Sequence, residues 1–154
     1  MSWEDGVRRA EPYVPGEQPK RADVIKLNTN ECPYPPAPEV KAVIGNMDYE
    51  TFRLYPDPDC GELVEALSAY YGLSEKQIFV GIGSDDVLAM AFLTFFNTGR
   101  PILFPDITYS FYDVWADLFR IPYEQIPLDD AFQIRAQDYI GRECGGIVIA
   151  NPNA

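Results

Sequence analysis

The sequence predicts an α/β fold in which a mostly parallel sheet lies between helices in three αβα layers. From residue 59 onward, short apolar segments alternate with stretches in which apolar side chains recur every three to four residues, as on one face of a helix. The apolar segments, such as Gly146-Ile-Val-Ile-Ala150, show no polar alternation, which is typical of strands buried on both faces. Strands that alternate with helices in this way form βαβ units with right-handed crossovers.

Each expected element follows from local residue chemistry. The first helix begins at Asp59-Cys-Gly-Glu62, which resembles a capping box with Asp59 as the cap, and it ends at Gly72. Pro122 and Pro127 flank the third strand and weaken it, because proline cannot donate to a ladder. The further elements, in order, are a strand at Ile78–Gly83, a helix from Asp85 to about Phe96, a strand at Ile102–Phe104, a helix from Ser110 to about Phe119, and strands at Tyr123–Leu128 and Gly146–Ala150.

Residues 1–58 have a different composition and are expected to form an irregular N-terminal arm. Nine of the fourteen prolines lie at or before Pro58, and proline restrains both itself and its predecessor to extended backbone. Three tyrosines in or near this arm, Tyr13, Tyr34 and Tyr55, indicate that it packs against other parts of a protein. The chain is therefore expected to divide into an arm over 1–58 and a sheet-containing part over 59–154.

Composition excludes several function classes. Histidine is absent, so the chain contains no Ser-His-Asp triad and no His-ligated zinc site, and we expect no metal site. A formal charge of −12 without a basic stripe argues against nucleic acid as a partner. No apolar run approaches the roughly 18 residues that span a bilayer, so no membrane partner is expected. The three cysteines form no CxxC motif and the first residues lack the apolar core of a signal peptide, which favours a cytoplasmic protein.

Three segments lie at expected strand ends, where open α/β sheets bind their ligands. Gly81-Ile-Gly83-Ser84-Asp85-Asp86 runs from strand to helix; Ser84 is expected to cap that helix, and the free N–H groups of its first turn favour an anion. In Pro105–Tyr112, Tyr109 either stacks on a planar ligand or fills the core. Asn151-Pro-Asn153 either contacts a ring substituent or forms an ordinary turn.

Five motifs in order resemble one enzyme family. The sequence is similar to the N-terminal part of the histidinol-phosphate aminotransferases, which are fold type I enzymes dependent on pyridoxal 5′-phosphate. The resemblance covers nearly the whole chain and implies that residues 59–154 are an incomplete large domain for that cofactor. The motifs are Asn28-Thr-Asn30-Glu31-Cys-Pro33, Arg53-Leu-Tyr55-Pro56, Gly81-Ile-Gly83-Ser84-Asp85-Asp86, Pro105-Asp-Ile-Thr-Tyr109-Ser-Phe-Tyr112 and Asn151-Pro-Asn-Ala154.

The resemblance implies roles in cofactor binding. Ser84 and Asp85 hold the cofactor phosphate, and Tyr109 stacks on the pyridine ring. Tyr55 reaches the phosphate of the partner's cofactor across a homodimer interface. The family places an asparagine before Pro-Thr-Gly against the cofactor's 3′ oxygen. Ala154 stands at that position here, so Asn153 or Asn151 is expected to substitute for it.

The resemblance also implies amino-acid and 2-oxo-acid substrates, with Tyr13 and Asn30 lining the substrate site. It places the lysine that forms the Schiff base after the end of this chain. Lys20, Lys26, Lys41 and Lys76 are not expected at a strand end, so no catalytic residue is assigned here and the chain alone is expected to be inactive.

Other functions stay open on the sequence alone. The chain could be a non-catalytic binding or interaction domain that retains half of the fold. It could also belong to another enzyme with the same cofactor, such as an aromatic aminotransferase or a phosphothreonine decarboxylase-like relative.

Overall fold

The computed structural model describes residues 2–8, 10–21 and 23–153. Contacts divide the chain into two compact units. The sheet unit comprises Met1–Tyr13 and Gly81–Ala154, and the arm unit comprises Val14–Val80. The sequence predicts a functional division after residue 58, between an arm and a cofactor-binding part. Contacts within the chain do not test a functional division, so this one stays a prediction.

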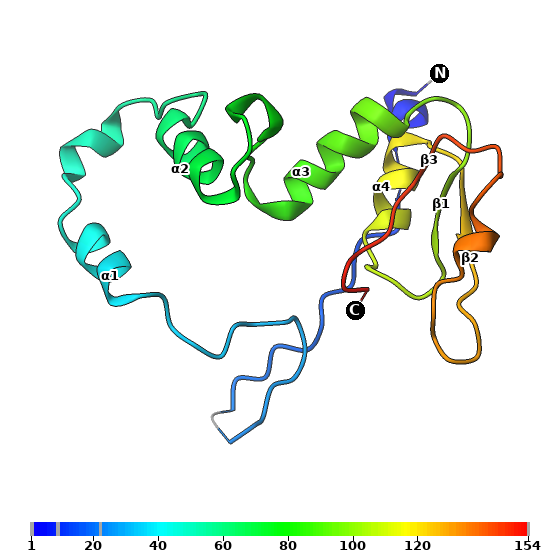
Figure 1. Ribbon diagram of the computed structural model, residues 1–154, viewed down its shortest axis with the longest axis horizontal. Coiled ribbons are helices and arrows are strands. Elements are labelled where there is room, and N and C mark those ends of the chain that lie inside the picture. The colour runs from blue at the N-terminus through cyan, green and yellow to red at the C-terminus, as the bar shows by residue number, and fades with distance from the viewer. Residues whose placement is uncertain (1, 9, 22, 154) are drawn as a thin grey trace. The chain divides into compact units, whose positions relative to one another are not determined.

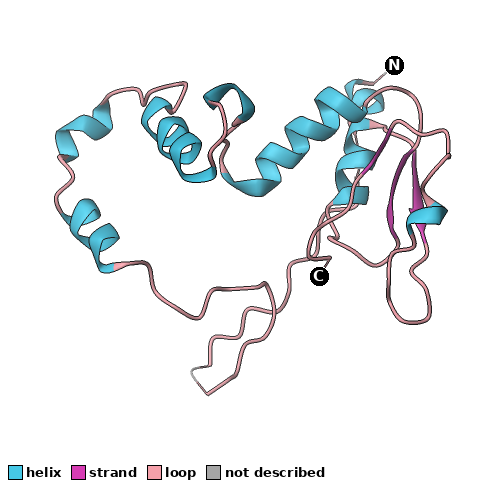
Figure 2. Cartoon of the chain, viewed as in Figure 1, coloured by secondary structure: helices cyan, strands magenta, loops and turns pink. Residues whose placement is uncertain are grey.

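A parallel sheet of three strands organises the sheet unit (Figure 2). β1 (Ile102–Pro105) lies between β2 (Tyr123–Ile126) and β3 (Gly146–Ile147). Both pairings are parallel, and Ile102 is level with Tyr123 on one side and with Gly146 on the other. Beyond β3, the Val148 N–H still donates to the Leu103 carbonyl at 2.9 Å. The last three expected strands and the α/β class are therefore confirmed, although β2 and β3 are shorter than predicted.

Helices cover one face of this sheet, where α4 (Tyr112–Phe119) lies against the strands (Figure 1). α3 (Gly83–Ala91) continues as the π-helical segment η4 (Phe92–Phe96), so the helix predicted to end near Phe96 is confirmed. Because successive strand side chains point to opposite faces, Ile102 and Phe104 both join the helix-side core. The buried members of that core are Phe92, Ile102, Phe104, Tyr112, Trp115, Ala116 and Ile121.

Leu103 points to the opposite face and packs with Ile126 and Tyr139. Partly buried Ile134 and Cys144 complete this second cluster. The segment that supplies these residues contains a 3₁₀ turn, η5 (Ala136–Asp138). Within the described part of the chain, the layer on this face is thus an irregular segment, whereas the three-layer expectation placed helices on both faces.

The strand expected at Ile78–Gly83 is wrong. Residues 78–82 form no strand, and Gly83 is already the first residue of α3. β2 and β3 occupy both edges of β1, and among the described residues no further strand pairs with this segment. Its apolar side chains stay uncovered, with Phe79 69% and Ile82 94% exposed. An apolar run does not by itself form a strand, because the strand needs a hydrogen-bonded neighbour.

The arm unit consists of short helices joined by irregular backbone. Its helices are α1 (Pro38–Gly45), η2 (Tyr49–Arg53), α2 (Gly61–Tyr71) and η3 (Glu75–Gln77). Tyr34 and Tyr55 are exposed within the described chain, so the expectation that the arm packs against other parts of a protein stays a prediction for these two tyrosines. One further short helix, the 3₁₀ helix η1 (Trp3–Gly6), belongs to the sheet unit. No helix in the described ranges has the length and apolar character needed to span a membrane.

The cap of α2 differs from the expected capping box. α2 starts at Gly61 after Cys60, which has left-handed backbone. The Asp57 carboxylate accepts hydrogen bonds from the N–H groups of Gly61 at 2.7 Å and Asp59 at 3.1 Å. Asp57 rather than Asp59 therefore anchors the helix start. These two donors hold the pKa of Asp57 below its ordinary value, because they favour the charged carboxylate.

We expect Asp57→Ala to fray α2, whereas Asp59→Ala leaves it intact. A carboxylate whose pKa is lowered on folding adds stability at pH values above its unfolded pKa of about 3.9. That contribution is lost as the pH falls through the lower pKa of the folded state. Far-ultraviolet circular dichroism from pH 7 to pH 2 measures both effects: the helical signal of the Asp57→Ala variant should be reduced at pH 7 and change less on acidification. Equal behaviour of the two alanine variants would contradict this account of the cap.

Candidate functional site

The turn before α3 lets ligands approach the backbone closely. A Cβ on Gly81 would lie 2.8 Å from Val87 Cγ2 and 3.0 Å from Asp86 Oδ2, so a side chain at this position would force Val87 to shift. Gly83 has φ +81°, and the space where its Cβ would stand is open. Its N–H donates to the Gly81 carbonyl at 2.9 Å. The next N–H groups, those of Ser84 and Asp85, have no partner within a helix and present partial positive charge.

Ser84 does not cap α3 as expected. The N-cap position is Ile82, and no side chain caps it by accepting from the helix's first turn. Instead the Asp86 carboxylate reaches back and accepts from the Ile82 N–H at 3.3 Å. Ser84 is the second residue of the helix and is exposed. The Asp86 side chain therefore holds the turn at Ile82 in place, and the Ser84 hydroxyl is not needed for this.

Tyr109 joins the end of β1 to the start of α3. Its hydroxyl donates to Asp85 Oδ1 at 2.5 Å. Three aromatic neighbours hold the half-buried ring, with centroid distances of 5.7 Å to Phe111, 5.7 Å to Tyr112 and 6.2 Å to Trp115. Burial, and next the Asp85 carboxylate, raise the pKa of Tyr109, so the phenol keeps its proton and acts as a donor. Tyr109 lines the edge of the core and also faces the α3 turn.

Asn153 is the second polar residue at this sheet edge. Its Oδ1 accepts from the Thr108 hydroxyl at 2.6 Å, and its Nδ2 donates to the Ile107 carbonyl at 2.9 Å. Asn151 is exposed and makes none of these contacts. The position compared with the family's asparagine, Ala154, lies outside the described residues. Of the two candidate asparagines, Asn153 is the one that hydrogen-bonds to the loop carrying Tyr109.

Sequence reasoning missed Thr108 and Asp106 in this loop. Thr108 orients Asn153, as described above. Asp106 Oδ1 accepts from the N–H groups of Ile107 at 2.9 Å and Leu128 at 3.0 Å, which joins the ends of β1 and β2. Both residues lie in the loop after β1. Asp106 bonds to the segment that follows β2, and Thr108 bonds to the segment that follows β3. The expected parallel strands placed these segments at one sheet edge, but did not indicate which side chains would pair.

Tyr13 packs on the sheet unit beside Tyr109. Its ring stacks on Phe111 with a centroid distance of 4.3 Å and an interplanar angle of 20°. Phe111 stacks in turn on Trp115 at 4.9 Å. Arg8 donates to the Leu118 carbonyl at 2.5 Å, near the C-terminal end of α4, where a cation is favoured. The first thirteen residues thus bring Tyr13 next to the aromatic group that surrounds Tyr109.

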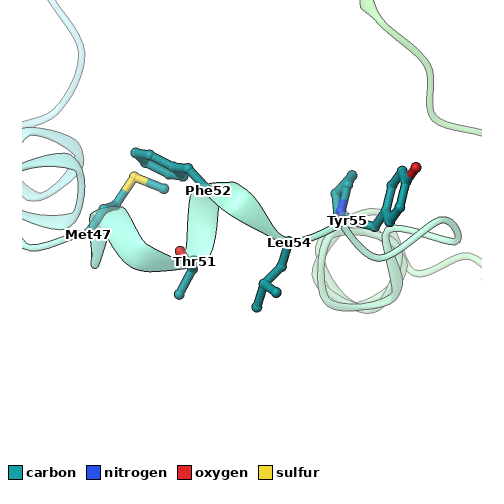
Figure 3. Close-up of a pocket in the computed structure, with 6 residues that line it drawn as sticks. Met47, Thr51, Phe52, Leu54 and Tyr55 are labelled. Atoms are coloured by element: carbon teal, nitrogen blue, oxygen red, sulfur yellow. The ribbon is translucent and has the colours of Figure 1, made fainter.

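Tyr55 and Asn30, the other two predicted site residues, belong to the arm unit. Tyr55 is fully exposed and lies at the end of a shallow hollow that Met47, Phe52 and Leu54 also line (Figure 3). Asn30 is exposed and has φ 50°, a left-handed conformation that asparagine tolerates. Neither residue is held by a side-chain bond within the arm unit's described residues. Their roles stay predictions.

The lysines also lie in the arm unit. Lys20, Lys26, Lys41 and Lys76 all fall within Val14–Val80, whereas the strand ends belong to the sheet unit. Lys26 donates to Gln18 Oε1 and to Thr29 Oγ1, each at 3.1 Å, and pairs with Glu31. None of the four is part of the sheet unit that holds Asp85 and Tyr109. The expectation that no lysine of this chain serves the strand-end site stays a prediction.

Comparison with known proteins identifies the family. A model of "Aminotransferase class I and II" matches residues 22–154. The chain is 51% identical over 154 residues to a histidinol-phosphate aminotransferase of Lactococcus lactis subsp. cremoris (strain MG1363), covering 100% of this chain and 43% of that protein. It is 53% identical over 152 residues to the histidinol-phosphate aminotransferase of Acetobacter pasteurianus, covering 99% of this chain and 42% of that protein. The chain thus spans less than half the length of these relatives. It belongs to the aminotransferase class I and II family.

Proposed function

We propose that this chain forms the N-terminal, cofactor-holding portion of a histidinol-phosphate aminotransferase dependent on pyridoxal 5′-phosphate. The reaction exchanges the amino group of histidinol phosphate with 2-oxoglutarate and yields imidazole acetol phosphate and glutamate. One observation carries the proposal. The 2.5 Å hydrogen bond between Tyr109 and Asp85 brings together the anion-favouring start of α3 and the aromatic ring that follows β1.

The residues present fit a phosphorylated aromatic cofactor. Gly81 leaves no room for a side chain, and Gly83 leaves open space in front of the turn. The N–H groups of Ser84 and Asp85 are the donors that a phosphate needs at a helix start. Tyr109 offers an aromatic ring fixed by its neighbours, and stacking on such a ring adds about 0.5–1.5 kcal/mol beyond burial. Asn153, anchored by Thr108, is the polar side chain for the ring's 3′ oxygen.

Pyridoxal phosphate, when bound, supplies an electron sink that permits a proton to leave the carbon bearing the amino group. The role of this chain's residues would be to bind and orient the cofactor and the substrate. The first turn of α3 would hold the phosphate, Tyr109 would stack on the ring, and Asn153 would hydrogen-bond to its 3′ oxygen. Tyr13, which stacks on Phe111, would line the substrate side. The family resemblance assigns a substrate role to Asn30 as well. The lysine and the further groups that complete the reaction are expected from the longer part of the relatives.

We further propose a cytoplasmic homodimer acting on amino-acid and 2-oxo-acid substrates. The exposure of Tyr55 supports its expected role as a residue that reaches the partner's cofactor phosphate. Both relatives are histidinol-phosphate aminotransferases, which supports the choice of substrate over the aromatic aminotransferase and decarboxylase alternatives.

A chimera tests this function. We join the 154 residues to the remaining C-terminal part of the Lactococcus lactis relative, which is 51% identical over this region. With pyridoxal phosphate, histidinol phosphate and 2-oxoglutarate, the chimera should form glutamate, and the 154-residue chain alone should form none above the free-cofactor background. A folded chimera that binds the cofactor and transaminates only aromatic amino acids, or releases carbon dioxide from phosphothreonine, contradicts the assigned substrate.

A further inference from the structure

Two carboxylates stand at the proposed phosphate site. Asp85 and Asp86 lie in the first turn of α3, next to the N–H groups that favour an anion. A carboxylate free to approach a phosphate dianion repels it, and this repulsion grows as water is excluded. The chain therefore has to restrain both acidic side chains if a phosphate is to bind here.

The structure shows a donor for each carboxylate. Asp86 accepts from the Ile82 N–H at 3.3 Å within the turn itself. Asp85 accepts from the Tyr109 hydroxyl, which comes from a loop 24 residues away in sequence. The two members of this second pair differ in burial: the Tyr109 ring packs against Phe111, Tyr112 and Trp115, whereas Asp85 is exposed. The packed phenol is thus the donor that holds the exposed Asp85 carboxylate in this position.

We propose that Tyr109 is a positioning residue for the cofactor phosphate as well as a stacking residue, because its hydroxyl holds the Asp85 carboxylate and keeps it from the phosphate. The inference rests on the proposed function, since it needs a phosphate at the start of α3. The proposal gives the two parts of the Tyr109 side chain different roles. The ring stacks on the planar ligand, and the hydroxyl keeps the negative charge of Asp85 away from the phosphate. It also explains how an acidic residue is tolerated at an anion site.

Removing only the hydroxyl tests the proposal. The 154-residue chain and its Tyr109→Phe variant are titrated with pyridoxal phosphate and, separately, with pyridoxal, which has the same ring and aldehyde but no phosphate. Tyr109→Phe should weaken pyridoxal phosphate binding about tenfold. Its affinity for pyridoxal should stay within twofold of the wild-type value, since the ring is kept. Circular dichroism and urea unfolding establish that each variant is folded.

Two further variants complete the test. Asp85→Asn removes the charge, so Tyr109→Phe added to it should no longer affect pyridoxal phosphate binding, as a double-mutant cycle measures. Tyr123→Phe is the control, because it removes the hydroxyl of a half-buried tyrosine that stacks on Phe104. It should change neither affinity.

The outcomes separate the inference from the proposed function. A wild-type chain that does not bind pyridoxal phosphate more tightly than pyridoxal refutes the phosphate site, and the inference falls with it. A wild-type chain that prefers the phosphate, with a Tyr109→Phe variant that changes neither affinity or both equally, refutes the inference and leaves the function standing. A double variant as weak as Tyr109→Phe alone also refutes it, because the effect would then not pass through the charge of Asp85.

Discussion

Replacing Phe92 with alanine should lower the free energy of unfolding by about 3–5 kcal/mol, the range for large aromatic deletions in a core. Phe92 has 0% exposure and lies at the point where α3 becomes π-helical. Its ring packs on Phe96, Tyr112 and Trp115, with centroids 5.5–5.9 Å away. The alanine variant leaves a cavity in the helix-side core and loses these contacts. Since ordinary domains have only about 5–15 kcal/mol of stability, this loss is a large fraction of the total.

Phe95→Ala is the matched control, because Phe95 lies in the same helical segment and is 68% exposed. It should change stability by no more than about 0.5 kcal/mol. Urea unfolding followed by tryptophan fluorescence measures both variants, since Trp115 lies in the affected core. Equal destabilisation by the two substitutions would show that the helix-side core is not organised around Phe92.

Gly146→Ala should destabilise the sheet unit by about 1–3 kcal/mol through overpacking. A Cβ on Gly146 would lie 2.5 Å from both Cδ1 and Cε1 of the Phe96 ring. Phe96 belongs to the layer of partly buried residues around the core, so its rigid ring moves only by disturbing its neighbours. β3 contains just Gly146 and Ile147, so a shift there removes a large part of its pairing with β1.

Gly6→Ala serves as the control for this substitution, because a Cβ on Gly6 would have no other atom within 4 Å. The same urea titration should find its midpoint close to that of the wild-type chain. A Gly146→Ala variant as stable as Gly6→Ala would mean that Phe96 does not pack against β3 in solution.

The sheet was predictable because its signal is short-range and its pairing rules are few. Ile102-Leu-Phe104 and the apolar run from Gly146 are bounded by turn residues, and parallel βαβ connections place them side by side. Ile78–Gly83 carries a similar apolar signal but forms no strand, because strand formation depends on a neighbour that local sequence does not specify. The same limit applies to Asp59: its spacing fits a capping box, yet Asp57 reaches the Gly61 N–H.

The candidate site was predictable in part. Asp85 and Tyr109 follow from motifs at expected strand ends, and the structure joins them by a hydrogen bond. The bond itself was not predictable, because it depends on side-chain reach between loops 24 residues apart. Sequence also gave no indication that Thr108 binds Asn153, since that contact arises only when β1 and β3 are neighbours.

The location of the cofactor phosphate is the central claim, and an amide chemical-shift titration of the ¹⁵N-labelled chain tests it most directly. Adding pyridoxal phosphate should move the Ser84 and Asp85 N–H resonances first and furthest, with Gly83 following. Pyridoxal without the phosphate should move them much less while still affecting residues around Tyr109. A phosphate site at the start of α3 would be contradicted if neither segment 81–86 nor segment 105–112 shifts, or if both ligands cause identical shifts.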